Sequence, residues 1–366
     1  MRILIPAYSF YPSQEGGPSN AIYWLASGLA NVGYEVRVVA TNRCQKPGAV
    51  IENTWLRLNG FDVVYATPNS QMKYLRQELP FCDVLIANGV CRICEFFFNL
   101  KAICANKRVI LSPRGELLDP AIFHKGKAYG LLKRLVFFFM RIAYEHKIVF
   151  HATSAEEVKS IRKYMGLKAN VVLIPNYMIL PDRINAEFEG PQYLLYVGRL
   201  NHIKNIDIII DGLAQSSIFR TNDVKFKLAG EKTGAYYESL KKQVKTLELS
   251  DKVEFLGLVT GDEKDRLYAG AKCLLLMSKS ENFGNVIVES LSQGTPVIAS
   301  RGTPWKQLEV KGIGYWIDAN AKQVTETVEN LLLMGDADYK AMRERAYAYS
   351  REFDIYTNIN QWIKVL

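Results

Sequence analysis

The clearest chemical group in this chain is a pair of glutamates, Glu281 and Glu289, which stand eight positions apart around the turn Phe283-Gly-Asn285. The apolar run 273–277 predicts a buried strand before them, and residues 285–293 have the spacing of a helix. Glu281 is therefore expected on the loop after a strand, and Glu289 on the helix that follows. Backbone amides at such a helix start have no acceptor within the helix, so they would face a bound phosphate.

Two cations flank a second loop, in the sequence Tyr-Val-Gly-Arg-Leu-Asn-His-Ile-Lys-Asn at positions 196–205. Gly198 ends a predicted strand and a helix is expected from Asn205, so Arg199 and Lys204 would stand beside a helix N-terminus. Two cations at a helix start suit a diphosphate, because they offset the charge of a departing nucleoside diphosphate. The alternative interpretation is an ordinary basic loop.

Both segments resemble the retaining glycosyltransferases of family four, which have the GT-B fold. Residues 278–300, with the Phe-Gly turn and the sequence Gly-Thr-Pro-Val-Ile-Ala, resemble the E-x7-E region of that family, and residues 198–204 resemble its Gly-Arg-x4-Lys motif. The resemblance implies an α/β fold of two Rossmann-like, doubly wound parallel-sheet domains that face a central cleft. The alternative for the first segment is two solvated glutamates on a strand-loop-helix.

The resemblance also implies roles for single residues. Glu281 would contact the donor sugar, and Glu289 would hold the ribose, because one carboxylate can accept hydrogen bonds from two neighbouring hydroxyls. Arg199, Lys204 and Glu281 are expected to be catalytic. The donor-binding residues expected besides these and Glu289 are Gly16, Gly17, Gly230, Leu256, Phe283, Gly284, Asn285 and Val286.

In the first half, the acceptor side is expected at Asn88 and Arg114. The loop 10–19, with Gly16-Gly17, resembles the glycine loop of the family, although a flexible loop tip is the alternative. The sequence Ser-Pro-Arg-Gly at 112–115 resembles a family signature in which many relatives carry histidine at the position of Arg114. Since arginine cannot act as a general base, Arg114 is expected to bind an acceptor hydroxyl or a phosphate instead.

Strands and helices alternate through both halves, which predicts parallel sheets. We expect an acceptor-side domain over 1–180, a nucleotide-sugar domain over 190–345, and a C-terminal helix over 346–366 that packs back toward the first domain. Neither half has Gly-x-Gly-x-x-Gly after its first strand, which argues against a nicotinamide or flavin enzyme. The pair Cys91-x-x-Cys94 is expected to be buried reduced thiols, and no metal or cofactor is expected.

The excess of positive charge is confined to the first half. Residues 1–180 hold 22 Lys and Arg against 12 Asp and Glu, and residues 181–366 hold 24 against 25. The stretch 125–147 mixes six of these cations with leucines and phenylalanines, so it is either a membrane-docking helix or a core helix with a solvated basic face. The sequence shows no signal peptide and no long apolar run, so a cytoplasmic protein is expected, peripheral at the inner face of the cell membrane if the helix docks there.

The expected function is transfer of a sugar from a UDP- or GDP-sugar to a glycan or lipid-linked glycan, in bacterial surface polysaccharide synthesis. A sugar-nucleotide epimerase of the same fold is the first alternative. A non-catalytic protein that binds an anionic polymer is the second, although no nucleic-acid-binding motif is found. Analysis of the products formed from a panel of nucleotide sugars separates the three.

Overall fold

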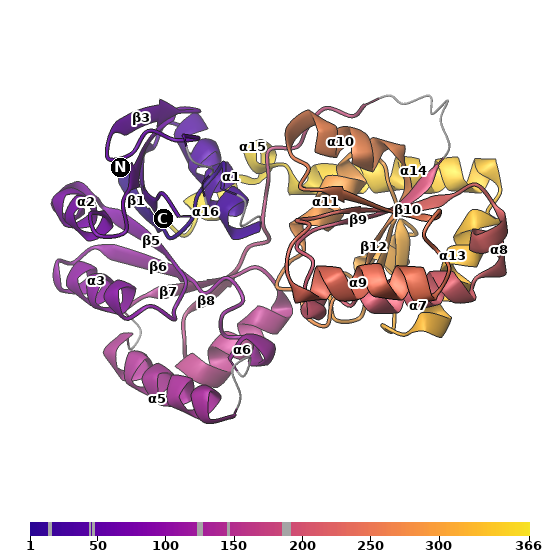
Figure 1. Ribbon diagram of the computed structural model, residues 1–366. Helices are drawn as coiled ribbons and strands as arrows, with labels where there is room; N and C mark the ends of the chain where they lie inside the picture. The colour runs from indigo at the N-terminus through magenta and orange to yellow at the C-terminus, as the bar shows by residue number, and fades with distance from the viewer. Residues whose placement is uncertain (14–16, 44, 46–47, 123–126, 145–146, 185–191) are drawn as a thin grey trace. The chain divides into compact units, whose positions relative to one another are not determined.

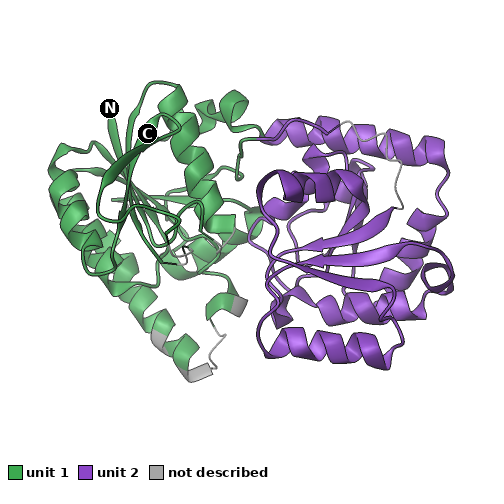
Figure 2. Cartoon of the chain, turned by 45° about the horizontal axis from the view of Figure 1, so that its top comes forward, with its two compact units in different colours: residues 1–179, 354–366 green, residues 180–353 purple. Residues whose placement is uncertain are grey.

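The computed structural model describes the chain except for residues 14–16, 44, 46–47, 123–126, 145–146 and 185–191. The described residues form two compact units, which Figure 2 colours separately. The first unit contains residues 1–179 and 354–366, and the second contains residues 180–353. Each unit has its own sheet and its own helices, and each is described by itself.

The first unit is built on an eight-stranded sheet. Apolar, β-branched runs form its strands, and every residue of the first strand after Arg2 is buried. All neighbouring strands are parallel except the first two in the sheet, which form an antiparallel hairpin at its edge. In spatial order the strands are β3 (Trp55–Leu58), β4 (Phe61–Ala66), β2 (Glu35–Thr41), β1 (Arg2–Ala7), β5 (Val84–Asn88), β6 (Arg108–Ser112), β7 (Val149–Ala152) and β8 (Val171–Leu173).

Helices cover both faces of this sheet (Figure 1). One apolar core joins the strands to α2 (Gln71–Glu78), α3 (Ile93–Cys104), α5 (Lys127–Tyr144) and α6 (Ala155–Met165). The helix α1 (Gly17–Asn31) packs on β1, β2 and β4 and contacts the short α15 (Ile355–Asn358). Two further short helices are α4 (Asp119–Ile122) and α16 (Asn360–Ile363).

The second unit is a six-stranded sheet in which every pair of neighbours is parallel. Figure 1 shows the sheet between two layers of helices, with α7, α9 and α13 on one face and α10, α11 and α14 on the other. The strand order is β11 (Val253–Gly257), β10 (Lys225–Ala229), β9 (Tyr193–Val197), β12 (Ala271–Leu276), β13 (Val297–Ser300) and β14 (Gly314–Ile317). The helices are α7 (Ile206–Gln215), α8 (Ser217–Thr221), α9 (Ala235–Thr246), α10 (Gly261–Gly270), α11 (Asn285–Ser292), α12 (Gln307–Val310), α13 (Ala321–Leu332) and α14 (Asp336–Ser350).

The predicted α/β class with two Rossmann-like sheets is confirmed, with two local differences. The antiparallel hairpin of β3 and β4 was not expected from the sequence. In place of one helix over 346–366, α14 ends at Ser350, a 3-10 turn follows, and residues 354–366 belong to the first unit. The break falls at Asp354, whose carboxylate accepts hydrogen bonds from the amides of Tyr356 and Thr357 and so starts a new helix.

None of the helices in the described part of the chain is both long enough and apolar enough to cross a membrane.

Candidate functional site

The carboxyl edge of the second sheet brings Glu281 and Lys204 into direct contact. Lys204 ends the loop after β9, and Glu281 lies on the loop after β12, which is the neighbouring strand. Their side chains form an ion pair, and the Ser278 hydroxyl donates a second hydrogen bond to the same carboxylate oxygen at 2.8 Å. Both charged side chains are more than four-fifths buried. Two of the three residues expected to be catalytic therefore form an ion pair with each other.

Arg199, the third of them, stands at the end of β9 with an exposed side chain. Its carbonyl accepts a hydrogen bond from the Tyr196 hydroxyl at 2.8 Å, which fixes the backbone and leaves the guanidinium toward solvent. The neighbouring strand β10 ends close by, where a Cβ on Gly230 would lie 2.3 Å from the carbonyl oxygen of Gly198. Glycine is therefore required at 230, because only its backbone fits beside this loop.

The start of α7 differs from the expectation of an open phosphate site. Its first amides, those of Ile206 and Asp207, both donate to the Tyr236 hydroxyl, at 2.9 and 3.2 Å. Tyr236 in turn donates to the Asp207 carboxylate at 2.5 Å. A side chain from α9 thus satisfies this helix N-terminus, so a diphosphate beside Arg199 and Lys204 would be held by the cations and not by these amides.

The start of α11 is shaped by Gly284, which has the left-handed φ of 87° that glycine adopts without strain. Asn285 and Val286 open the helix directly after it, as predicted. Phe283 is only 6% exposed, and its ring packs against Trp305 and Phe353 at centroid distances of 5.3 and 5.9 Å. The phenylalanine therefore anchors the turn in an aromatic core.

Glu289 points from α11 to two residues of α10 that the sequence patterns did not reveal. Lys264 contacts one carboxylate oxygen at 3.0 Å, and the Tyr268 hydroxyl donates to the other at 2.9 Å. Burial by itself would lower the pKa of Lys264, but the charge of Glu289 and the hydrogen bond to it outweigh burial and raise that pKa. Burial also raises the pKa of Tyr268 well above its ordinary range, so Tyr268 remains a donor. The four-residue spacing of Lys264 and Tyr268 indicates that both lie on one face of a helix, but it does not indicate that this face contacts Glu289.

Leu256 is half-buried near the end of β11, at the same carboxyl edge of this sheet. Gly17 is the first residue of α1 in the first unit. Gly16 lies outside the described residues.

The two acceptor-side residues predicted in the first unit contact each other. Arg114 donates from Nε to the Asn88 side-chain oxygen at 3.0 Å, and from Nη1 to Asn176 at 3.1 Å. Asn88 donates to the carbonyl of Pro6 at the end of β1. Burial lowers the pKa of Arg114 to about 10, so the guanidinium is still charged at neutral pH. Arg114 adopts a left-handed backbone with φ of 55°, uncommon for a residue other than glycine.

A buried histidine supports this region. The His151 Nε2 contacts the Ile174 carbonyl at 2.8 Å, so that nitrogen carries the proton, and the Ser112 hydroxyl donates to Nδ1 at 2.8 Å. Burial and the charge of Arg114 lower the pKa of His151 to about 3. The ring is therefore neutral through the physiological range and serves as a structural support.

The predicted burial of Cys91 and Cys94 was wrong, since both are exposed, although both are free thiols. Cys91 lies on the turn before α3 and Cys94 in its first turn, outside the core that the helix forms further along.

Within the described residues, no group of three or more potential ligands could hold a metal ion. The sequence has Asp-x-Asp spacing at Asp336 and Asp338, and both residues are exposed at the start of α14.

Comparison with known proteins assigns the second unit. Residues 181–352 match the family model "Glycosyl transferases group 1". This segment, which holds Arg199, Lys204, Glu281 and Glu289, is therefore similar to the domains of that family.

Curated relatives have related names. The chain is 30% identical over 167 residues, 45% of its length, to the alpha-monoglucosyldiacylglycerol synthase of Streptococcus pneumoniae. It is 27% identical over 286 residues to a Campylobacter jejuni N-acetyl-D-galactosaminyltransferase that acts on an undecaprenol-linked glycan, covering 75% of this chain and 73% of the relative. The first five relatives are matched over only 26 to 42% of their own lengths.

Solved structures resemble the whole chain in fold. Sucrose-phosphate synthase from Thermosynechococcus elongatus has a TM-score of 0.77 at 16% identity, covering 100% of this chain and 98% of its own. Anabaena Alr3699/HepE, solved with UDP-glucose, has a TM-score of 0.75 at 19% identity, with both chains fully covered. Identities this low establish the shared GT-B fold and nothing further about the chemistry.

Proposed function

We propose that this chain is a glycosyltransferase that moves a sugar from a nucleotide-sugar donor to a glycan or lipid-linked glycan acceptor. The observation that carries the proposal is the match of 181–352 to the group 1 family, because the matched segment contains the ion pair of Lys204 and Glu281 at a sheet edge. Ligands of open parallel sheets bind beyond the carboxyl ends of the strands. The donor would be a UDP- or GDP-sugar.

In this proposal the donor diphosphate lies against Arg199 and Lys204. The exposed guanidinium of Arg199 has donors available, and Lys204 would share its charge between Glu281 and a phosphate. Both cations would offset the negative charge that builds up on the departing nucleoside diphosphate. The reaction is then independent of a metal ion, since these cations take the place of one.

The carboxylates would hold the two sugars of the donor. Glu281 would contact the sugar that is transferred, and Glu289 would accept the ribose hydroxyls, as in the E-x7-E arrangement. Lys264 and Tyr268 occupy one lone-pair direction on each oxygen of Glu289, which leaves acceptor capacity for a ligand. Transfer with retention of the anomeric configuration completes this proposal.

The acceptor side would lie near Asn88 and Arg114 in the first unit. Gly17, the first residue of α1, and the preceding Gly16 would contact the donor, as the family resemblance implies. In keeping with the expected role in bacterial surface polysaccharide synthesis, we place the protein in the cytoplasm at the inner face of the cell membrane. The helix α5 supports this placement. Its buried side chains, Phe137, Met140 and Tyr144, face the core of the first unit.

The opposite side of α5 is apolar as well as basic. Arg134 and Arg141 are exposed on this helix, and its sequence contains no acidic residue. Six apolar side chains of this helix are between 48 and 60% exposed, and most recur at helical spacing: Leu131, Leu135, Val136, Phe138, Phe139 and Ile142. A plain core helix would present polar groups at these positions, whereas an apolar and cationic face suits an anionic membrane surface.

A panel of UDP-, GDP- and ADP-sugars tests the donor site by thermal denaturation. A true donor at a hundred times its Kd should stabilise the fold by about 2.7 kcal/mol. The shift should disappear for that donor in Glu289→Ala, with folding intact. If no nucleotide sugar shifts the unfolding temperature, the donor proposal fails, and binding of an anionic polymer becomes the better account.

A further inference from the structure

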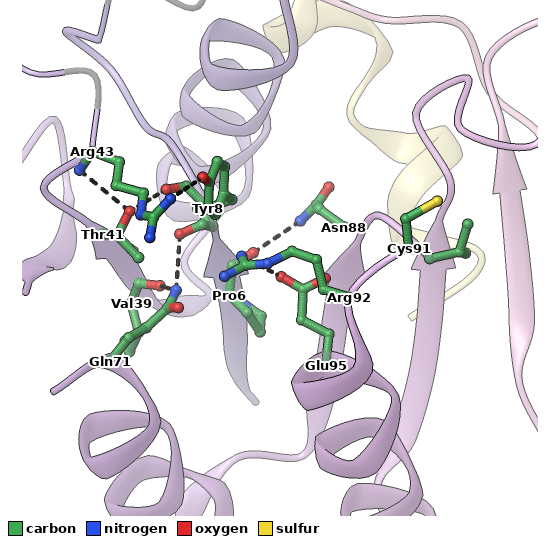
Figure 3. Close-up of polar contacts among 12 residues, drawn as sticks. Pro6, Tyr8, Val39, Thr41, Arg43, Gln71, Asn88, Cys91, Arg92 and Glu95 are labelled. Carbon is green, nitrogen blue, oxygen red and sulfur yellow. Dashed lines mark hydrogen bonds and ion pairs between the residues drawn. The ribbon is translucent and has the colours of Figure 1, made fainter. Parts of the chain in front are cut away.

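Three donor side chains meet at the carboxyl edge of the first sheet, apart from the Asn88 and Arg114 pair. In this sheet β1 lies between β2 and β5. Tyr8 follows β1, Arg43 follows β2, and Arg92 follows β5 and precedes α3. Because the carboxyl ends of parallel strands meet at one edge, the two arginines approach Tyr8 from the neighbouring strands, as Figure 3 shows.

The Tyr8 ring holds both guanidinium groups. The central carbon of the Arg92 guanidinium lies 4.1 Å from the ring centroid, and that of Arg43 lies 5.1 Å from it. Arg43 also donates from Nη1 to the Tyr8 hydroxyl at 2.5 Å. Contacts of this kind restrict two long side chains, so less conformational freedom is lost when a ligand binds.

The donors of this group are only partly used. Arg92 donates from Nη1 to Glu95 at 2.8 Å, and its other two guanidinium nitrogens donate no hydrogen bond within the described residues. Arg43 forms no ion pair with any described carboxylate. The Tyr8 hydroxyl accepts from Arg43, so its own proton is free to be donated.

Arg37, on the same sheet, shows what a structural arginine looks like in this unit. Its guanidinium lies within 4 Å of the carboxylates of Glu35, Asp62 and Glu78, so its charge is offset by the protein itself. Arg43 has no carboxylate partner among the described residues. The Arg92 side chain is one-third exposed and pairs with one carboxylate, that of Glu95. This contrast indicates that the positive charge of Arg43 and Arg92 is available to bind a ligand.

We propose that Tyr8, Arg43 and Arg92 bind a phosphoryl group of the acceptor substrate. The group offers two cations against the single carboxylate of Glu95, and several donors that are not used within the protein, which suits a dianion that has acceptor oxygens alone. A soluble sugar phosphate and a lipid-linked phosphate share this chemistry. That the phosphate belongs to an acceptor rests on the proposed function, because the second unit has its own cations for the donor.

Calorimetric titration of the full chain tests the site. The second unit is first saturated with UDP, and the protein is then titrated with inorganic phosphate, a hexose 6-phosphate and the neutral hexose. We expect the two phosphates to bind and the hexose to bind far more weakly. Arg43→Gln and Arg92→Gln should each weaken phosphate binding about ten-fold or more, the effect of losing a charged hydrogen bond. UDP binding should be unchanged in both.

Arg57→Gln is the matched control, since Arg57 is an exposed arginine of the same sheet that pairs with Asp62. It should bind phosphate as the wild type does, and unfolding temperatures show that all variants are folded. Vesicles containing phosphatidic acid form the lipid arm, tested in the Arg134→Gln, Arg141→Gln variant so that binding through α5 is reduced. A further loss of binding on adding Arg43→Gln, but not on adding Arg57→Gln, assigns the phosphate to a lipid-linked acceptor.

Failure of all phosphate probes to bind in an Arg43-dependent way overturns the proposal, as does tighter binding of a hexuronate than of the hexose phosphate. Failure of UDP to bind contradicts only the proposed donor site in the second unit. The Arg43→Gln and Arg92→Gln variants still test the phosphate site in the first unit.

Discussion

Lys204 and Glu281 form a largely buried ion pair although they are 77 residues apart in the sequence. They come from the loops after β9 and β12, which are neighbours in the second sheet. Removing either partner leaves the other charge buried without compensation, which is costly. Their contact couples the residue expected at the donor sugar to the residue expected at the diphosphate.

The carboxylates should be essential to transfer if they hold the donor. Glu281→Gln keeps the shape but removes the charge, and Glu289→Ala removes both acceptor oxygens. We expect turnover to fall by at least ~100-fold in one of them, the scale of losing a well-placed charged contact. Glu326→Gln is the control, because Glu326 is an exposed residue of α13. Near-normal turnover in both site variants, with folding intact, would contradict the donor-site proposal.

The cations should recognise the diphosphate and not the nucleoside. Arg199→Ala and Lys204→Ala are each expected to weaken binding of the nucleoside diphosphate by ~10- to 100-fold and to change nucleoside binding little. Calorimetry with the two ligands gives the comparison. Lys225→Ala is the control, since exposed Lys225 starts β10 and lies at the opposite edge of the sheet. Equal losses for both ligands would mean that these residues do not contact phosphate.

The exposed face of α5 should bind anionic vesicles. Each Lys or Arg near an anionic surface contributes about 1 kcal/mol, so Arg134→Gln with Arg141→Gln should weaken binding about 30-fold. Phe138→Ser with Phe139→Ser should also weaken it, because both rings are exposed. Co-sedimentation with anionic and neutral vesicles, at low and high salt, measures these effects.

The charge control for this experiment is Lys73→Gln with Arg76→Gln, which removes two exposed cations from α2. It should bind vesicles nearly as the wild type does, and donor affinity should be the same in every variant. Three further cations, Lys125, Lys127 and Lys133, are expected from the sequence to contribute to vesicle binding, and Lys125 lies outside the described residues. A wild-type protein that stays in the supernatant with anionic vesicles at low salt would rule out the membrane proposal.

Glu95 should make the stability of the protein depend on pH. Its side chain faces Arg92 and Glu116, and burial, only partly offset by Arg92, raises its pKa from 4.5 to about 7. The folded state therefore holds a proton that the unfolded state releases between these pH values, so stability falls as pH rises through that window. A difference of one between the folded and unfolded pKa corresponds to about 1.4 kcal/mol of stability.

Glu95→Gln carries no such proton and removes this dependence. Relative to the wild type, the variant should gain stability between about pH 5 and about pH 8, measured by urea unfolding followed by tryptophan fluorescence. Because the variant and the wild type share all other titrating groups, His151 among them, the contributions of those groups cancel in the difference in stability. Unfolding curves that keep a constant separation at the two pH values would show that Glu95 titrates normally.

Local patterns predicted most of the elements but not the contacts between distant ones. Apolar runs located β9 and β12 to within two residues, and loop composition located Arg199, Lys204 and Glu281. The pairing of Glu289 with Lys264 depends on how α10 packs against α11, and the capping of α7 by Tyr236 depends on α9. Such contacts follow from tertiary packing, for which the sequence carries no local signal.

The same limit applies to the first unit. Arg43 and Arg92 stand 49 positions apart in the numbering, and only the strand order β2, β1, β5 brings them to Tyr8. The outward apolar face of α5 could not be predicted either, because a mixed helix sequence does not say which apolar side chains the core takes up.

The most direct test of glycosyl transfer is the product balance of the full chain with its stabilising nucleotide sugar and a set of glycan and lipid-linked acceptors. Mass spectrometry measures the glycosylated product, and a coupled assay measures the released nucleoside diphosphate. We predict equal molar amounts of both, a product one sugar heavier than the acceptor, and loss of both in Glu281→Gln. Free sugar and nucleotide formed without an acceptor would contradict glycosyl transfer and favour the epimerase.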